Sequence, residues 1–411
     1  MCAPSGSNRA AAETGRESFE VADVVRAHGA ELRATHRLAP VQVQALRAIE
    51  ACRTQVLGGR REVCDGCGKE RRAWNSCRNR HCPKCQSLSQ ARWAEERKAE
   101  LLPVEHFQVV FTLPHDLNPL AQGNPGLIYD LLFRSVSDTL LTFGRDPKHL
   151  GGETGFTAVL HTWGQTLDQH LHLHCIVPGG ALSPDGSEFR LARPHFLFPV
   201  EALSPIFREK FLEGLRDAFD GKKLRFARGT ENLADPETFA AFLKTLKRHE
   251  WVVYANGSSS GAGSLVDYLA RYTQKVAIGN ERIVGVRDGI VRFRYRDYSD
   301  GSRSKVMELP AVEFLRRFLL HVLPRGFVRI RHYGFLANRH RRRKLDRALA
   351  LLHQPPLPPP APAESAADLF RRLTGADPSL CPFCRKGHMR VVEFLPPLPH
   401  SSSAPPRNDS S

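Results

Sequence analysis

The sequence lacks several features that would assign it to common protein classes. It has no uninterrupted apolar run of the roughly 18 or more residues that a membrane-spanning helix needs. Residues 1–18 do not combine a basic start with an apolar stretch, so no secretory signal is expected. There is no GxxxxGKS or GxxxxGKT phosphate-binding loop and no internal repeat. The sequence therefore predicts an intracellular, cytoplasmic protein without a membrane span.

Acidic residues are few relative to basic ones. The chain of 411 residues has 43 Asp and Glu against 59 Lys and Arg, which gives a net charge of +16. A charge of this sign and size favours a polyanionic partner, most simply nucleic acid. Hydrophobic residues make up 41% of the chain, which is enough to bury a core. The length suggests two or three structural units.

The composition divides the chain into four parts. Residues 1–18 are small and polar and are expected to be disordered. Residues 19–95 predict helices followed by a cysteine-rich, zinc-binding, DNA-binding module. Residues 100–350 alternate strand and helix patterns, ending in a basic segment. Residues 354–411 are rich in proline and are expected to form a largely disordered tail that carries one Cys-x-x-Cys pair.

Clustered cysteines indicate zinc rather than disulfides in a chain without a secretory signal. Two Cys-x-x-Cys pairs, 14 residues apart, suit one tetrahedral zinc site. The expected ligands of this structural zinc are Cys64, Cys67, Cys82 and Cys85. Cys77 and His81 are extra candidates, which would replace one member or indicate a second site. Cys381 and Cys384, with His388, form only a half-site, which either takes ligands from elsewhere or is a remnant.

Three histidines alternate in the stretch DQHLHLHCIVPGG, residues 168–180. A β-strand points alternate side chains to one face, so His170, His172 and His174 share a face and the leucines between them point the other way. Imidazoles at this spacing, about 6–7 Å apart in Cα, can converge on one divalent metal ion. A site made only of histidine suits Zn, Mn, Ni or Cu, and Mg less naturally unless substrate phosphates complete its shell.

A preceding strand is predicted over FTAVLHTW, residues 156–163, joined to the histidine strand by a short polar turn. If the two strands pair antiparallel, His161 lies beside His172 or His174 and supplies a third ligand. The competing third ligands are Gln165, Asp168 and His170.

Two tyrosines, Tyr268 and Tyr272, lie in a predicted helix over residues 265–277. Their spacing places them on one helix face, flanked by Arg271 and Lys275 at the same spacing. Tyrosine is a poor nucleophile at its usual pKa of about 10. A metal or cation stabilises the phenolate, and attack on phosphorus then gives a covalent phosphotyrosine. The alternative interpretation is a pair of half-buried core aromatics.

The stretch RIRHYGFLANRHRRRKLDRAL, residues 329–349, concentrates arginine around Tyr333 and Phe335. A dense run of like charge repels itself without an anion, which favours phosphate binding over a solvated helix face. With Arg271 and Lys275, the residues expected to bind DNA are Arg329, Arg331, Arg339, Arg341, Arg342 and Arg343.

Taken together, these motifs resemble the HUH-type rolling-circle insertion-sequence transposases with two tyrosines and an N-terminal zinc-binding module. The resemblance covers roughly residues 20–390, in order. The stretches that carry it are SCRNRHCPKCQ (76–86), FTLPHDLNPL (111–120), HTWGQTLDQHLHLHCIVPGG (161–180), YLARYTQKVAI (268–278) and RHYGFLANR (331–339). Leu171 stands where the family pattern leads one to expect proline.

The resemblance implies that His172 and His174 are the core metal ligands and that Tyr268 and Tyr272 are the nucleophiles. It implies Mg²⁺ or Mn²⁺ as the catalytic ion, single-stranded DNA at element ends and target DNA as substrates, and association with the bacterial nucleoid. Attack by one tyrosine leaves a 5′-phosphotyrosine and a free 3′-OH, and the second tyrosine permits a second strand transfer. We therefore expect an α+β fold, with a mainly antiparallel sheet, the histidine strand at its centre, the tyrosine helix across its face and a separate N-terminal zinc lobe.

Three other functions fit parts of the pattern. A zinc hydrolase built on the histidine strand needs a carboxylate general base near the metal, and the sequence has no convincing pattern for one. A plasmid or phage rolling-circle replication initiator uses the same chemistry. A non-catalytic zinc-finger regulator would bind DNA without needing either tyrosine. The sequence does not define the oligomeric state.

Overall fold

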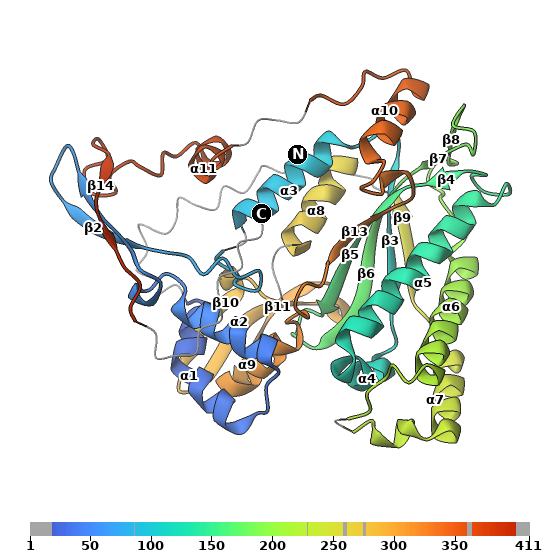
Figure 1. Ribbon diagram of the computed structural model, residues 1–411, viewed down its shortest axis with the longest axis horizontal. Helices are drawn as coiled ribbons and strands as arrows, with labels where there is room; N and C mark the ends of the chain where they lie inside the picture. Colours follow the sequence, from blue (N-terminus) through green and yellow to red (C-terminus); the bar gives the residue numbers. More distant parts are fainter. Residues whose placement is uncertain are drawn as a thin grey trace.

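Figure 1 shows the computed structural model, which describes residues 19–85, 87–227, 229–257, 261–273, 277–359 and 364–399, apart from the side chains of residues 271–273. Helices pack on sheets whose named strand pairs are all antiparallel, which confirms the expected α+β class. Among the described residues, no helix combines the length and apolar character needed to cross a bilayer.

The largest sheet has five strands, in the order β13-β5-β6-β3-β9. Their bounds are β3 (His106–Thr112), β5 (Phe156–Trp163), β6 (Gln169–Pro178), β9 (Val253–Gly257) and β13 (Ile330–Tyr333). β5 and β6 form the expected hairpin, and the histidine strand β6 is the central strand. A central strand is hydrogen-bonded along both edges, so its side chains are held in a fixed register.

Different helices cover the two faces of this sheet (Figure 1). On one face, Leu171, Leu173 and Cys175 are buried in the main hydrophobic core. The helices of that core are α4 (Asn118–Gly123), α5 (Pro125–Arg145), α6 (Val200–Asp220) and α7 (Pro236–Arg248). On the other face, Ile176 packs against α3 (Ser87–Ala99) and α8 (Ala262–Thr273). The tyrosine helix α8 therefore lies over β5 and β6, on the face that carries the histidines.

A second core joins the N-terminal helices to a later part of the chain. It unites α1 (Val21–Thr35), α2 (Pro40–Ala51), α9 (Ala311–Leu320) and the sheet of β10 (Ile283–Arg287), β11 (Ile290–Asp297) and β12 (Arg303–Pro310). Asp288 and Gly289 connect β10 and β11 with φ of 51° and 73°, a two-residue loop that suits the strand twist. The sequence assigned α1 and α2 to a separate lobe. They share this core instead, because each short helix has one apolar face to bury against a larger partner.

A third sheet, in the order β14-β1-β2, extends from one side of the molecule (Figure 1). It consists of β1 (Gly59–Cys64), β2 (Glu70–Trp74) and β14 (Met389–Leu395). The helix α11 (Ala366–Thr374) precedes β14 and lies beside α3, where Arg372 pairs with Glu95 at 2.6 Å. The largely disordered tail expected over residues 354–411 is thus corrected for residues 364–399. The partner strand of β14 is β1, which lies more than 300 residues earlier, so the composition of the tail did not reveal the pairing.

A smaller unit packs near the end of the five-stranded sheet. It contains the sheet β4-β7-β8, with β4 (Glu153–Thr154), β7 (Gly180–Leu182) and β8 (Phe189–Leu191), and the helix α10 (Arg341–Leu351). Phe335, Leu345 and Leu349 form its buried centre with Phe189. Gly334 enters this unit with φ of 57°, and a Cβ there would overlap the carbonyl oxygen of Thr154. The arginine-rich segment is therefore folded into the body of the protein.

Candidate active site and metal centres

Three histidines on β5 and β6 converge on one point. His161 is the direct cross-strand partner of His172, and His174 lies two residues further along the same face of β6. The ring centroids of His161 lie 5.2 Å from those of His172 and 4.4 Å from those of His174. Their ligand nitrogens all lie within 4.8 Å of one another. Hairpin pairing thus brings together the three residues that the sequence proposed as a metal site.

Hydrogen bonds orient two of these imidazoles. Nδ1 of His172 lies 2.9 Å from the carbonyl oxygen of His170, so Nδ1–H donates and Nε2 keeps its lone pair. The Nε2 atoms of His172 and His174 are 3.1 Å apart. Nδ1 of His174 lies 2.8 Å from the side-chain amide of Gln108 on β3. The amide atom at this distance is Nε2 of Gln108, whose N–H donates to Nδ1 of His174; rotation of the amide by 180° presents its oxygen instead and leaves Nε2 of His174 to bind a metal.

Burial sets the charge of the histidine cluster. Loss of solvent lowers the pKa of His174 to about 4 and places the pKa values of His161 and His172 well below the usual range. Neighbouring imidazoles depress these values further, because like charges would repel. The three rings are therefore neutral near pH 7. Neutral imidazole is the form that binds a metal, so both the donor set and its protonation fit a divalent ion.

The competing third ligands are engaged elsewhere. The carboxylate of Asp168 pairs with Arg317 at 2.8 Å. Gln165 contacts the hydroxyl of Tyr298. Nδ1 of His170 lies 2.9 Å from Nε2 of His115, at the outer end of the histidine row. Among the described residues, the group that converges on His172 and His174 includes His161 and none of these three.

An aromatic and cationic stack lies beside His161, and the sequence reasoning missed it. The indole of Trp163 stacks on His161 with centroids 5.0 Å apart, and the guanidinium of Arg329 lies 4.9 Å from the Trp163 ring. Nε of Arg329 donates to the carbonyl oxygen of Leu160 at 3.0 Å. Burial lowers the pKa of Arg329 to about 9, which still leaves it charged at neutral pH. Arg329 thus places a positive charge near the metal-site candidates.

The tyrosine helix brings Tyr268 toward the histidine cluster. The ring of Tyr268 is partly buried, and its centroid lies 6.3 Å from that of His174 in an edge-on orientation. The helix packs beside α3, where Lys98 pairs with Asp267 at 2.6 Å. Tyr272 and Arg271 belong to α8, but their side chains lie outside the described part of the chain, as does Lys275.

Several of the arginines expected to bind DNA have internal partners. Arg331 pairs with Asp130 and lies 4.1 Å from the Phe133 ring, and Arg341 pairs with Glu100. Nearby acids thus relieve the like-charge repulsion that the sequence pattern suggested. With Arg329 in the stack beside His161, these residues are placed within the protein body. Of the members whose side chains the structure describes, Arg339, Arg342 and Arg343 are exposed, and Arg342 also donates to backbone carbonyls of residues 357 and 358.

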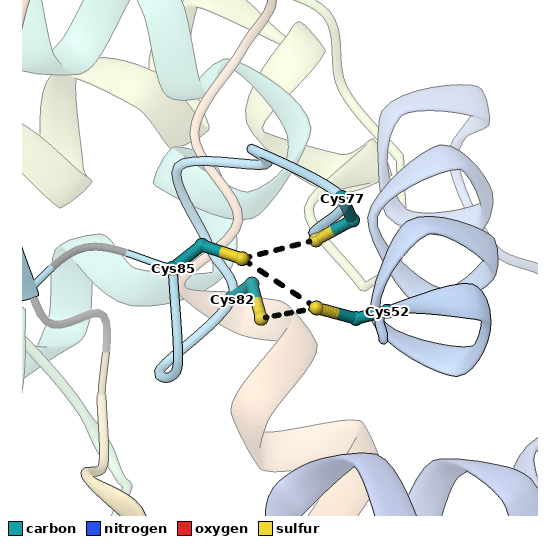
Figure 2. Close-up of side chains that lie close together, drawn as sticks. All are labelled: Cys52, Cys77, Cys82 and Cys85. Atoms are coloured by element: carbon teal, nitrogen blue, oxygen red, sulfur yellow. Dashed lines mark hydrogen bonds between the residues drawn. The ribbon is translucent and has the colours of Figure 1, made fainter. Parts of the chain in front are cut away.

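One cysteine cluster joins the end of α2 to the loop before α3 (Figure 2). It consists of Cys52, Cys77, Cys82 and Cys85, with Sγ–Sγ distances of 3.5 Å from Cys52 to Cys85 and 3.7 Å from Cys77 to Cys85. Four thiolates around zinc at about 2.3 Å lie about 3.8 Å apart along the edges of a tetrahedron. The cluster has this spacing.

A second cluster contains Cys64, Cys67, Cys381 and Cys384. The predicted ligand set is therefore corrected, because Cys64 and Cys67 lie in one cluster and Cys82 and Cys85 in the other. The proposed extra ligand Cys77 joins the first cluster. The prediction grouped Cys64 and Cys67 with the wrong pair because sequence spacing favours neighbouring Cys-x-x-Cys pairs. In the folded chain they lie instead beside Cys381 and Cys384, more than 300 residues away.

Two residues near the first cluster complete this correction. His81 is not among its members, since Nε2 of His81 accepts from the backbone N–H of Leu323 at 3.1 Å. Burial lowers the pKa of His81 to about 3, which suits this acceptor role. Cys52, which the sequence analysis overlooked, follows α2 as a single cysteine. A sequence signal for it was the number of grouped cysteines, which is seven and therefore one short of two sites with four cysteines each: Cys64, Cys67, Cys77, Cys82, Cys85, Cys381 and Cys384.

Two family models match this chain, one over the part that contains the histidine cluster and one over the part that contains the first cysteine cluster. Residues 155–344 match a family model described as "Putative transposase", and residues 24–113 match a "Transposase zinc-binding domain". The chain is 50% identical over 386 residues to "Putative transposase y4qJ" of Sinorhizobium fredii, covering 92% of this chain and 96% of that protein. It is 28% identical over 353 residues to the transposase for insertion sequence element IS801 of Pseudomonas savastanoi pv. phaseolicola, covering 84% and 82%. No solved structure matches the chain.

Proposed function

The chain belongs to the insertion-sequence transposase family of IS91 and IS801 type, and from this membership we propose that it nicks and joins single-stranded DNA at element ends through a 5′-phosphotyrosine. A transposase of this family carries a zinc-binding domain and acts on DNA at the ends of its element. The observation that carries the finer proposal is the approach of Tyr268 to the histidine cluster of β5 and β6.

We assign Tyr268 and Tyr272 as nucleophiles. Both belong to α8, one helical turn apart, and α8 lies over the sheet face that holds the histidines. A nucleophile must reach the phosphorus atom while the group that stabilises the phosphate oxygens is in contact with the same phosphate. The proximity of Tyr268 to His174 supports this assignment, and α3 packs beside α8, where Lys98 pairs with Asp267.

The three histidines would hold the divalent ion, Mg²⁺ or Mn²⁺. When bound at His161, His172 and His174, such an ion polarises the non-bridging oxygens of the scissile phosphate. The chain itself supplies neutral imidazoles, a fixed register of β5 and β6, and the Gln108 amide that orients His174. Arg329 adds a positive charge beside the cluster, which favours a bound phosphate.

The strand transfer exchanges one phosphoester bond for another. The tyrosine oxygen forms a bond to phosphorus as its O–H proton leaves, and the bond from phosphorus to the 3′ oxygen breaks. The 3′ oxygen takes up a proton and becomes a free 3′-OH, while the 5′ end stays on the tyrosine. Attack of a 3′-OH on this phosphotyrosine reverses the exchange on a new strand, so no nucleotide triphosphate is consumed.

DNA would reach the site along exposed basic residues. Arg339, Arg342 and Arg343 are exposed on and before α10, and Arg271 and Lys275 follow Tyr268 in the sequence. Contacts with phosphates would make binding sensitive to salt. We place the catalytic unit in residues 100–350 and the zinc-binding unit in residues 19–95, with the two units in contact through the second core.

A covalent adduct assay tests the proposal. The full-length protein is incubated with a single-stranded oligonucleotide that carries an element end, with Mg²⁺ or Mn²⁺, and resolved on a denaturing gel. A protein–DNA band that maps to Tyr268 or Tyr272 is expected, and Tyr298→Phe, at an exposed tyrosine in the short 3-10 helix after β11, should leave it intact. Binding without an adduct under either metal would contradict the proposal and favour a regulator without catalysis.

A further inference from the structure

The second cysteine cluster connects two distant parts of the chain. Cys64 is the last residue of β1 and Cys67 lies in the turn to β2, and Cys381 and Cys384 lie in the segment before β14. The zinc-binding domain match, which spans residues 24–113, ends far short of this second pair. We propose that these four cysteines bind a second structural zinc ion, which fastens the C-terminal segment to the N-terminal β-ribbon.

The sulfur positions fit zinc and not disulfides. The Sγ–Sγ distance is 3.7 Å between Cys64 and Cys384 and 3.8 Å between Cys67 and Cys381, and all four sulfur atoms lie within 4.8 Å of one another. A disulfide has a sulfur–sulfur distance of about 2.0 Å, whereas the edges of a zinc tetrathiolate are about 3.8 Å long. A set of four thiolates is also the donor set that selects zinc among common divalent ions.

Backbone donors around the sulfur atoms repeat in both halves of the site. The N–H groups of Gly66 and Cys67 point at Sγ of Cys64, each at 3.4 Å. In the other half, the N–H of Gly387 points at Sγ of Cys384, also at 3.4 Å. Hydrogen bonds of this kind stabilise thiolate over thiol and orient it toward a shared cation. Each Cys-x-x-Cys turn is therefore built as a metal-binding half-site.

The two halves also fit each other closely. A Cβ on Gly387 would lie 2.7 Å from Sγ of Cys64 and 2.7 Å from the backbone nitrogen of Gly66, so only glycine allows this approach. Asp65 bridges the halves, since its carboxylate accepts from the backbone N–H of His388 at 2.7 Å and from Arg390 at 3.1 Å. The two turns therefore contact each other through a close glycine approach and hydrogen bonds of Asp65 as well as through the cysteines.

The site holds the C-terminal segment at one end of a chain of contacts that leads to the tyrosine helix. β14 pairs with β1 directly beside the cluster. Before it, α11 is fixed to α3 by the pair of Arg372 with Glu95. α3 in turn pairs with α8 through Lys98 and Asp267. Because a short three-stranded ribbon has little core of its own, a metal is the element that makes this closure stable.

Zinc content of paired variants tests the assignment. Purified full-length protein and its variants are compared by elemental analysis for zinc equivalents per chain. We expect Cys381→Ser with Cys384→Ser to lose one equivalent, and Cys64→Ser with Cys67→Ser to lose the same one. The variant with all four substitutions should therefore lose one equivalent and not two. Cys52→Ser with Cys77→Ser should lose a different equivalent, so that combining it with Cys381→Ser and Cys384→Ser removes two.

An unchanged zinc content in the variant with Cys381→Ser and Cys384→Ser would overturn the proposal. So would the loss of one and the same zinc equivalent by substitution of Cys64 and Cys67 and by substitution of Cys82 and Cys85. A variant that misfolds is identified because it would lose the zinc of the first cluster as well. For that case, Co²⁺ replaces zinc in the unaltered protein and in Cys384→His, which keeps four ligands. The absorption spectrum of Co²⁺ in the parent should be that of two tetrathiolate sites, and in Cys384→His the contribution of one site should shift. An identical spectrum in the two proteins would contradict the assignment. None of these measurements depends on strand-transfer activity, so the proposed chemistry can fail without affecting them.

Discussion

The ring of Tyr268 meets the ring of His174 edge-on, with 6.3 Å between their centroids. One residue comes from a helix and the other from the central strand, about a hundred positions apart in the sequence. This contact places a nucleophile candidate at the edge of a metal-site candidate. The most direct predictions concern these two groups.

Removal of the tyrosine hydroxyls should abolish the covalent adduct while DNA binding persists. Tyr268→Phe keeps the ring contacts in the cluster around Leu265 and Leu269, so the fold should be unchanged. We expect Tyr268→Phe together with Tyr272→Phe to give no adduct on a denaturing gel, with DNA affinity within about twofold of the parent protein. A persistent adduct in the double variant would assign the nucleophile to another residue.

Substitution of Gln108 should weaken metal binding without removing a ligand. Its amide orients Nδ1 of His174, and loss of such an orienting partner typically lowers metal affinity about 10–100-fold. Isothermal titration with Mn²⁺ should show this loss for Gln108→Leu and no measurable binding for His172→Ala. His170→Ala, at the outer end of the row beside His115, is the matched control and should bind Mn²⁺ nearly as well as the parent. Equal losses in all three variants would contradict the assigned site.

The first cysteine cluster should be sensitive to Cys52 and indifferent to His81. Cys52→Ser removes one sulfur of the tetrahedron and should release one zinc equivalent and lower the melting temperature, because the cluster borders the second core. His81→Asn changes a residue that accepts from Leu323 and lies outside the cluster, so its zinc content should equal that of the parent. The reverse pattern in zinc analysis would restore His81 as a ligand.

Exposed and paired arginines should differ in their effects on DNA binding. Arg339→Gln and Arg343→Gln should each reduce the slope of log affinity against log salt by about 0.7 for single-stranded DNA, measured by fluorescence anisotropy. Arg331→Gln instead breaks a pair with Asp130 and a contact with Phe133. It should lower thermal stability and leave the salt slope unchanged. A salt slope that falls in Arg331→Gln but not in Arg339→Gln or Arg343→Gln would place the DNA at Arg331 on β13 and not at the exposed arginines.

Acid should destabilise the protein through its buried histidines, and His321 provides a clean case. Nδ1 of His321 faces the hydroxyl of Thr162 and Nε2 faces the carbonyl oxygen of Leu167, and burial lowers its pKa from 6.5 to about 4. The unfolded chain binds this proton more readily, so the stabilisation is full above about pH 6.5 and is lost as the pH falls toward 4. The loss amounts to about 3 kcal/mol at 1.36 kcal/mol per pKa unit. The free energies of urea unfolding of His321→Asn and of the parent should therefore converge as the pH falls from 6.5 to 4, and a difference that stays constant over this range would contradict the assignment.

Local patterns allowed much of the catalytic fold to be predicted. The alternation of His170, His172 and His174 with leucines indicated a half-polar strand, and the polar turn after Trp163 indicated its partner. The spacing of Tyr268 and Tyr272 indicated a helix, and the position of that helix over the sheet follows from the apolar face formed by Leu265, Val266 and Leu269. These features depend on neighbours in the sequence, and such signals survive in a single chain.

The parts that could not be predicted depend on contacts between distant segments. Nothing near Cys64 indicates that Cys384 is its neighbour, and nothing near Arg331 indicates Asp130. The stacking of Trp163 between His161 and Arg329 also needs the edge strand β13 to be placed first. Residues identical in type can therefore differ in role, because pairing with an acid or a second thiol removes them from the surface.

The pairing of β14 with β1 determines when the protein can be completed during synthesis. A ribosome makes β1 early and must add more than 300 further residues before it makes β14. Until then β1 and β2 remain an incomplete hairpin with an open edge. A message or gene copy truncated before residue 389 would still encode the histidine strand and the tyrosine helix but would leave this edge open. Only a translation product that includes β14 closes it.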